Sequence, residues 1–125
     1  MIENRIRTKT IINAKTIAAG GTHTPTAYID LNTKYIDGEF SIQILLAGDG
    51  IAKIEYLLSN DGSTFIDPTG AADIVTGFTK TSGRAGTGTD LIPVNLTSVS
   101  GFLNFKVTET GGADSITITV VLVYK

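Results

Sequence analysis

The side chains that could carry out catalysis are few in this sequence and have no partners at catalytic spacing. His23 is the single histidine, and a serine triad would need it as the base, but no serine lies in a G-x-S-x-G elbow. A pair of carboxylates is harder to exclude, because four aspartates lie in or near expected loops: Asp49, Asp61, Asp67 and Asp73. A pair that cleaves sugars usually lies in a cleft framed by aromatic rings, and the chain has no tryptophan. The sequence therefore predicts a protein that is not an enzyme.

Metal and anion sites find little support in the sequence. Without cysteine or a second histidine, zinc lacks its usual ligands. Aspartates and asparagines on turns would suit calcium, but the spacing of an EF-hand is absent and both residues are common turn formers. The glycine-rich run 83–88 (GRAGTG) lacks the Gly-Lys-Ser/Thr ending of a phosphate-binding loop, and no helix is expected after it. We predict no cofactor and no metal.

The composition predicts one small soluble domain with a lightly charged surface. The 125 residues allow one ordinary domain, and 42% of them are apolar, which is enough for a core. Only 18% are charged, which suggests that part of the surface contacts other protein. The net charge of −2 gives no general attraction to nucleic acid or to an anionic membrane, so we expect neither as a partner.

Several processing features are also absent. With no cysteine there is no disulfide framework, which favours folding in a reducing cytosol. The longest purely apolar run, 120–123, is too short to cross a bilayer. The N-terminal residues lack the apolar core of a signal peptide.

The N-terminal segment has a pattern of its own. Residues 1–18 alternate between apolar and charged side chains, and Gly20 and Gly21 end the pattern. Four basic side chains and one acidic one give residues 1–16 a formal charge of +3, while six basic and eleven acidic ones give the rest −5. We therefore expect residues 1–21 to form an extended arm, of which 1–18 contribute little to the core, and residues 22–125 to form one domain. The arm either docks on another copy of the chain or is a solvated strand face.

The remaining sequence is typical of a sandwich of short strands. Alternation with a period of two covers 40–46, 52–58, 103–107 and 116–124, and turn signals recur between these runs. Pro93 indicates that the strand 91–96 lies at a sheet edge or bulge, and segment 79–90 predicts a long loop. About eight strands in all predict an all-β, antiparallel β-sandwich or jelly roll.

The alternation also predicts which side chains face inward. The main core is expected to contain six residues: Phe40, Ile54, Tyr56, Phe105, Ile118 and Val120. The last strand carries Val121 and Val123 on the face opposite Val120 and Leu122. Because a single sandwich has one interior, this second apolar face requires cover from the arm or from a neighbouring subunit.

One strand and turn resemble a known group of proteins. The run 54–65 (IEYLLSNDGSTF) ends a strand in Tyr-x-x-Ser-x-Asp-Gly-x-x-Phe, and GFLNFKVTET (101–110) precedes the final strand. Over residues 40–125 this pattern resembles virion proteins of tailed bacteriophages, particularly jelly-roll capsid decoration and auxiliary proteins. The resemblance implies a virion protein made in the bacterial cytoplasm. It also implies the major capsid protein or another virion protein as partner, and a homo-oligomer for which we expect a trimer.

The sequence supports one main hypothesis and one alternative. An extended arm can pair its free backbone groups with the sheet edge of a neighbour, and repeated weak contacts then add avidity. The residues predicted to carry assembly are Ile2, Arg5, Ile6, Arg7, Lys9, Val121 and Val123. The same Ser-x-Asp-Gly-x-x-Phe turn also resembles discoidin-like, galactose-binding jelly rolls, in which a tryptophan commonly replaces the aromatic residue that is Phe65 here. The alternative is therefore a carbohydrate-binding module with Tyr28, Tyr35 and Asp61 as loop contacts.

Overall fold

The fold is taken from a computed structural model that describes residues 6–32, 38–68, 73–96 and 100–125. Within these ranges the chain forms nine strands and one 3-10 turn. The elements are β1 (Arg7–Ile17), β2 (Thr22–His23), β3 (Ile29–Asp30), β4 (Phe40–Ala47), β5 (Ala52–Ser59), β6 (Asp73–Phe78), η1 (Arg84–Gly86), β7 (Thr89–Val94), β8 (Phe102–Glu109) and β9 (Ile116–Tyr124). No helix among the described residues is long and apolar enough to span a membrane.

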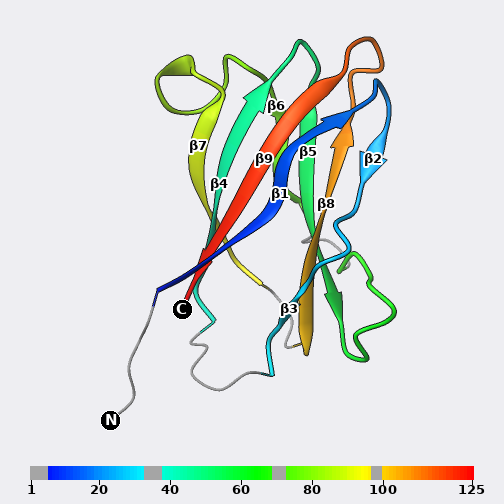
Figure 1. The fold of residues 1–125 in the computed structure, drawn as a ribbon, viewed down its shortest axis with the longest axis vertical. Helices are drawn as coiled ribbons and strands as arrows, with labels where there is room; N and C mark the ends of the chain where they lie inside the picture. The colour runs from blue at the N-terminus through cyan, green and yellow to red at the C-terminus, as the bar shows by residue number, and fades with distance from the viewer. Residues whose placement is uncertain (1–5, 33–37, 69–72, 97–99) are drawn as a thin grey trace.

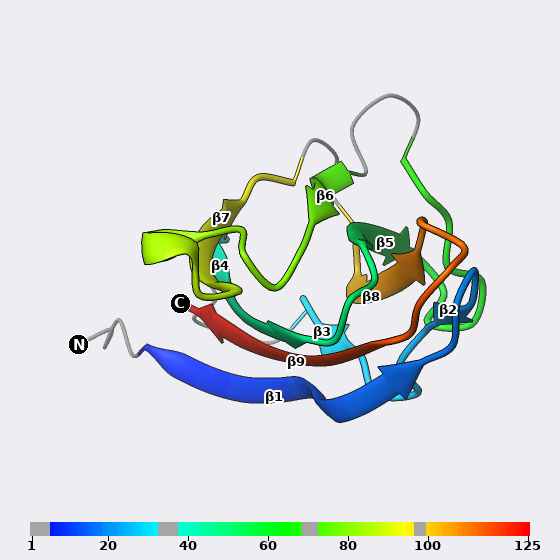
Figure 2. The same ribbon diagram turned by 90° about the horizontal axis from the view of Figure 1, so that it is seen from above.

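The strands form two antiparallel sheets that face each other (Figure 1 and Figure 2). The four-stranded sheet has the order β1-β9-β4-β7, and the five-stranded sheet has the order β2-β8-β5-β6, with β3 also paired to β8. Strands distant in sequence are neighbours in both sheets, as the crossing connections of a jelly roll require. The predicted all-β, antiparallel sandwich is confirmed.

The core lies between the sheets and contains the side chains that alternation assigned to it. All six predicted core residues are buried, and none is more than 7% exposed: Phe40, Ile54, Tyr56, Phe105, Ile118 and Val120. They come from β4 and β9 in one sheet and from β5 and β8 in the other. The expected parity of these four strands is therefore correct.

Two further expectations concern β7 and the loop before it. β7 is the edge strand of the four-stranded sheet, so the position predicted from Pro93 is confirmed. The expected loop over 79–90 ends at residue 88, because Thr89 and Asp90 already pair with Leu45 and Ile44 of β4.

β1 contributes to the core of its own chain, which contradicts the expectation for residues 1–18 over their described part. It pairs with β9 from Arg7 opposite Tyr124 to Ile17 opposite Ile116. Register shifts on both sides of Ile12 interrupt the regular alternation, so that Ile11 and Ile12 are both buried, as is Ile17. The segment is extended, as predicted, but it is a sheet strand. The division of the chain at residue 21 stays a prediction.

The buried position of Ile12 leads to a first prediction. We expect Ile12→Val to lower the free energy of unfolding by about 0.5–1.5 kcal/mol, because it removes one buried methyl group. Denaturant unfolding measures this change. Thr10→Ser, at an exposed position of the same strand, is the control and is expected to change the free energy by less than about 0.5 kcal/mol. Equal effects of the two substitutions would mean that β1 does not pack on the core.

Candidate assembly surface

The outer faces of the two sheets differ in how far the chain itself covers them. On the five-stranded sheet Asn104 is only 4% exposed, and its side-chain Nδ2 donates to the Pro25 carbonyl at 2.8 Å. The ring of Tyr28 packs on Phe102 and Phe65, with centroids 5.4 and 5.3 Å away. These contacts bring the segment between β2 and β3 and the segment after β5 against the sheet. Much of this outer face is therefore occupied by the protein's own loops.

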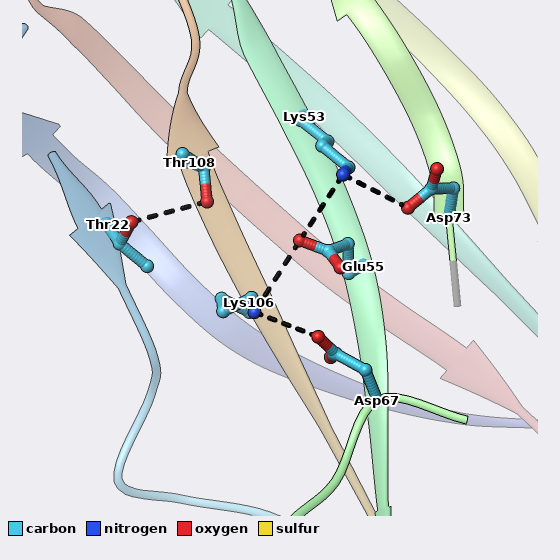
Figure 3. A network of polar contacts seen from close by, with 7 residues as sticks. All are labelled: Thr22, Lys53, Glu55, Asp67, Asp73, Lys106 and Thr108. Atoms are coloured by element: carbon cyan, nitrogen blue, oxygen red, sulfur yellow. Dashed lines mark hydrogen bonds and ion pairs between the residues drawn. The ribbon is translucent and has the colours of Figure 1, made fainter. Parts of the chain in front are cut away.

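A network of ion pairs connects neighbouring strands of the same sheet with each other and with the segment after β5 (Figure 3). The carboxylate of Glu55 on β5 lies 3.9 Å from the ammonium of Lys53 and 3.7 Å from that of Lys106 on β8. Lys53 also contacts Asp73 of β6 at 3.5 Å, and Lys106 contacts Asp67 at 3.1 Å. The hydrogen bond that Lys106 donates to Asp67, with a smaller contribution from the charge of Glu55, raises the pKa of Lys106. Each of the two lysines thus pairs with two carboxylates, and the network links β5, β6, β8 and the segment after β5.

The aspartates considered for catalysis each have a separate structural partner. Asp67 and Asp73 pair with the lysines of this network, and Asp49 pairs with Lys80. Asp61 accepts hydrogen bonds within its own turn. Among the described residues no group of three or more His, Cys, Asp or Glu side chains could hold a metal ion.

His23, the remaining candidate, lies half-buried on β2 opposite Val107 of β8. Burial, together with the charge of Lys15, lowers its pKa. The imidazole is therefore held in its neutral form more firmly than an exposed histidine at the same pH.

The outer face of the four-stranded sheet has a different character. Two rows of side chains cross all four strands in register, and none of the eight side chains is charged. They are Thr10, Val121, Gln43 and Leu91 in one row, and Thr8, Val123, Ser41 and Pro93 in the other. Leu91 is 64% exposed and Leu45, further along β4, is 53% exposed. These two rows therefore form an uncharged strip that includes the exposed Leu91, with the exposed Leu45 at the next outward position of β4.

The C-terminal half of β9 is apolar on both faces, as the alternation predicted. Val120 and Leu122 are fully buried between the sheets. Val121 and Val123 lie half-buried at the centre of the two outer rows, between β1 and β4. β1 therefore lies beside these valines, and its Thr8 and Thr10 extend the same outer face.

The residues predicted on the arm are divided between different environments. Ile2 and Arg5 lie outside the described residues. Ile6 is 72% exposed and lines, with Val123 and Tyr124, a shallow hollow of about 210 Å³. The guanidinium carbon of Arg7 lies 6.0 Å from the centre of the Tyr124 ring, and Lys9 Nζ lies 3.5 Å from the Tyr28 carbonyl. The structure therefore brings Ile6 beside Val123, whereas Arg7 and Lys9 contact their own chain.

No family model matches the chain, and no curated protein matches its sequence. Infectious bursal virus derived T=1 particles contain a similar structure, with a TM-score of 0.52 and 17% identity over 96% of this chain and 31% of that chain. The T13 infectious bursal disease virus particle gives a TM-score of 0.52 and 16% identity over the same shares. The protein CpGH89CBM32-6 of Clostridium perfringens gives a TM-score of 0.40 and 14% identity, covering 98% of this chain and 95% of that chain.

These likenesses define a class of fold. The chain spans about a third of the length of the viral chains that it matches. It has the jelly-roll fold found in the particles of those viruses. At identities this low the likeness concerns the fold alone, and the score of the Clostridium protein is too low for a comparison of sites.

Proposed function

We propose that this chain is a non-enzymatic structural protein of a virion and that it assembles through the outer face of its four-stranded sheet. The observation that carries the proposal is the pair of uncharged rows centred on Val121 and Val123. A partner that covers these rows displaces water from apolar and small polar side chains without desolvating a charge, which is the costly step in burial. The viral jelly-roll fold supports the same assignment.

The phage resemblance of the sequence supports a more specific role. In this proposal the protein is a decoration or auxiliary protein that cements a bacteriophage shell, and it is made in the host cytoplasm. Its partners are the major capsid protein or another virion protein and further copies of itself, as a trimer. Ile6, Val121 and Val123 form the apolar centre of the contact. The proposal also assigns a part in assembly to the other residues predicted on the N-terminal segment: Ile2, Arg5, Arg7 and Lys9.

Val121→Lys is the test of this surface. We expect the wild-type chain to be an oligomer by light scattering at micromolar concentration and the variant to be a monomer, because the ammonium would have to be buried in the contact. The melting temperature is expected to change little, since Val121 is only half-buried in the single chain and a lysine can extend to solvent.

Thr76→Lys provides the matched control for this experiment. It adds the same charge at an exposed strand position of the five-stranded sheet, and it should assemble like the wild type. A Val121→Lys variant with the wild-type oligomeric state would place the contact elsewhere. A wild-type chain that is monomeric and does not bind particles would contradict the proposed function itself.

A further inference from the structure

An open pocket lies at the end of β5, where the chain leaves the five-stranded sheet. Its volume is about 470 Å³, within the range of sites for small ligands. Its lining combines apolar side chains with polar ones: Leu58, Ile66 and Pro68 with Ser59, Asn60, Asp61, Thr64 and Ser100. Ile66 is 62% exposed although its backbone pairs in both directions with Leu58, at 3.0 and 2.9 Å. The pocket therefore has an exposed apolar wall on a backbone that is hydrogen-bonded in place.

The carboxylate of Asp61 is held in a defined orientation at this pocket. Its Oδ1 accepts hydrogen bonds from Ser59 Oγ at 2.9 Å and from the backbone N–H groups of Ser63 and Thr64 at 2.8 Å each. The N–H groups of Thr64 and Ser63, followed by the Ser59 hydroxyl, lower the pKa of Asp61 to about 2. All three bonds use the same oxygen. Oδ2 is therefore the carboxylate oxygen that none of these three bonds uses.

Asn60 supplies a complementary group beside this carboxylate. Ser100 Oγ donates to the Ser59 carbonyl at 2.7 Å and lies 3.1 Å from Asn60 Oδ1. Ser100 has one hydroxyl proton, which it gives mainly to the Ser59 carbonyl, so the Asn60 amide keeps an acceptor at Oδ1 and two donors at Nδ2 for a ligand. An acceptor on Asp61 and donors on Asn60 thus stand next to each other on one rigid turn.

We propose that this pocket binds a neutral carbohydrate of one or two sugar rings. A sugar hydroxyl can donate to the carboxylate of Asp61 and accept from the amide of Asn60, and adjacent hydroxyls can use both groups together. The C–H face of the ring would lie on Ile66 and Pro68, which a purely polar ligand would leave in water. An anion would be repelled by Asp61, and a divalent cation would find no second carboxylate in the lining.

This binding function does not depend on the proposed role in assembly. The pocket belongs to the five-stranded sheet and its loops, whereas the assembly surface lies on the four-stranded sheet. Of the loop contacts suggested by the sequence, only Asp61 lines the pocket. Tyr28 packs on Phe65 and Phe102, and Tyr35 lies outside the described residues.

Titration of the full-length, ¹⁵N-labelled chain with D-galactose, D-glucose and N-acetyl-D-glucosamine at millimolar concentration tests the proposal. We expect at least one of these sugars to shift the amide signals around the pocket, above all those of Asn60, Asp61 and Ser100. Asp61→Asn keeps an oxygen for the three internal hydrogen bonds and replaces the free carboxylate oxygen with an amide. Since a hydrogen bond to a charged group is lost, affinity should fall about tenfold or more.

Further variants and probes make the outcome decisive. Asn60→Ala, at an exposed position, should also weaken binding, whereas Asp114→Asn removes the same charge elsewhere and should not. Val121→Lys should bind sugar like the wild type, which separates this site from assembly. The proposal is overturned if no sugar shifts these signals, or if Asp61→Asn and Asn60→Ala both bind like the wild type. It is equally overturned if glycerol or methylamine shifts the signals as strongly as the sugars do.

Discussion

Replacing Phe105 with alanine is expected to lower the free energy of unfolding by about 3–5 kcal/mol. Phe105 lies at the centre of β8, has no exposed surface and stands opposite Tyr56 of β5. The substitution removes a large buried ring, and residues on the facing sheet cannot move far enough to fill the space. Denaturant unfolding of the two chains measures the difference, with the slope of the transition as a check that both unfold in one step.

Phe65 offers a control of the same residue type. Its ring is half-buried outside the sandwich, against Tyr28. Phe65→Ala should therefore cost clearly less than Phe105→Ala, since less apolar surface is buried there. A loss below about 1 kcal/mol for Phe105→Ala would mean that the two faces of β8 are assigned the wrong way round.

The second large effect is expected at Glu109, a carboxylate that is only 1% exposed. Its Oε1 accepts from the backbone N–H groups of Gly20 at 2.9 Å and Gly112 at 2.7 Å, and its Oε2 accepts from those of Ile51 and Gly111 at 2.8 Å each. These four donors belong to the connections β1–β2, β4–β5 and β8–β9. One side chain thus joins three loops at one end of the sandwich.

Glu109→Gln is expected to lower the melting temperature near neutral pH by about 5–10 °C. The amide has nearly the same shape, but its nitrogen would face two N–H donors and would leave them without an acceptor. Thermal unfolding followed by circular dichroism measures the change. Asp114→Asn, at an exposed position, is the control for the loss of charge. Melting of Glu109→Gln within about 1 °C of the wild type would mean that this carboxylate does not hold the loops together.

The same substitution has a predictable pH dependence. The N–H groups of Ile51, Gly20, Gly112 and Gly111 lower the pKa of Glu109 from 4.5 to about 2 in the folded chain. Between these two pH values the unfolded chain binds more protons than the folded chain does. The contribution of the Glu109 carboxylate to the free energy of unfolding is therefore complete above about pH 4.5 and is lost as the pH falls towards 2. The melting temperatures of the wild type and Glu109→Gln should therefore converge as the pH falls through this range. A difference that stays constant down to pH 2 would contradict the lowered pKa.

Much of the fold could be predicted because the relevant signals are local. The side chains of a strand alternate regardless of its partner, so the buried faces of β4, β5, β8 and β9 follow from the sequence. Pro93 lacks the N–H group that a central strand needs, and it indicated an edge position without knowledge of the neighbouring strand. The two apolar faces of the C-terminal half of β9, and hence the valines of the proposed assembly surface, were visible for the same reason.

The errors and omissions arose where a residue depends on a distant partner. The buried Ile11 and Ile12 of β1 could not be foreseen, because the register shifts are defined by pairing with β9, more than a hundred positions away. Glu109 follows Val107 on the inward side of β8, but the donors that stabilise it come from turns far along the chain. The lysine partners of Asp67 and Asp73 are non-local as well.

The sequence by itself determined that this protein is an antiparallel β-sandwich. It also determined which faces of β4, β5, β8 and β9 are buried, and that the C-terminal half of the last strand is apolar on both sides. These properties follow from the period of two and from turn residues, which act within a few positions. Only the tertiary structure decided which outer face is left uncovered. The outer face of the five-stranded sheet is largely covered because Pro25, Tyr28 and Asp67 reach it from loops. β1 lies beside β9 without covering Val121 and Val123. Whether a face is covered depends on where distant segments pack, and that is a property of the folded chain as a whole.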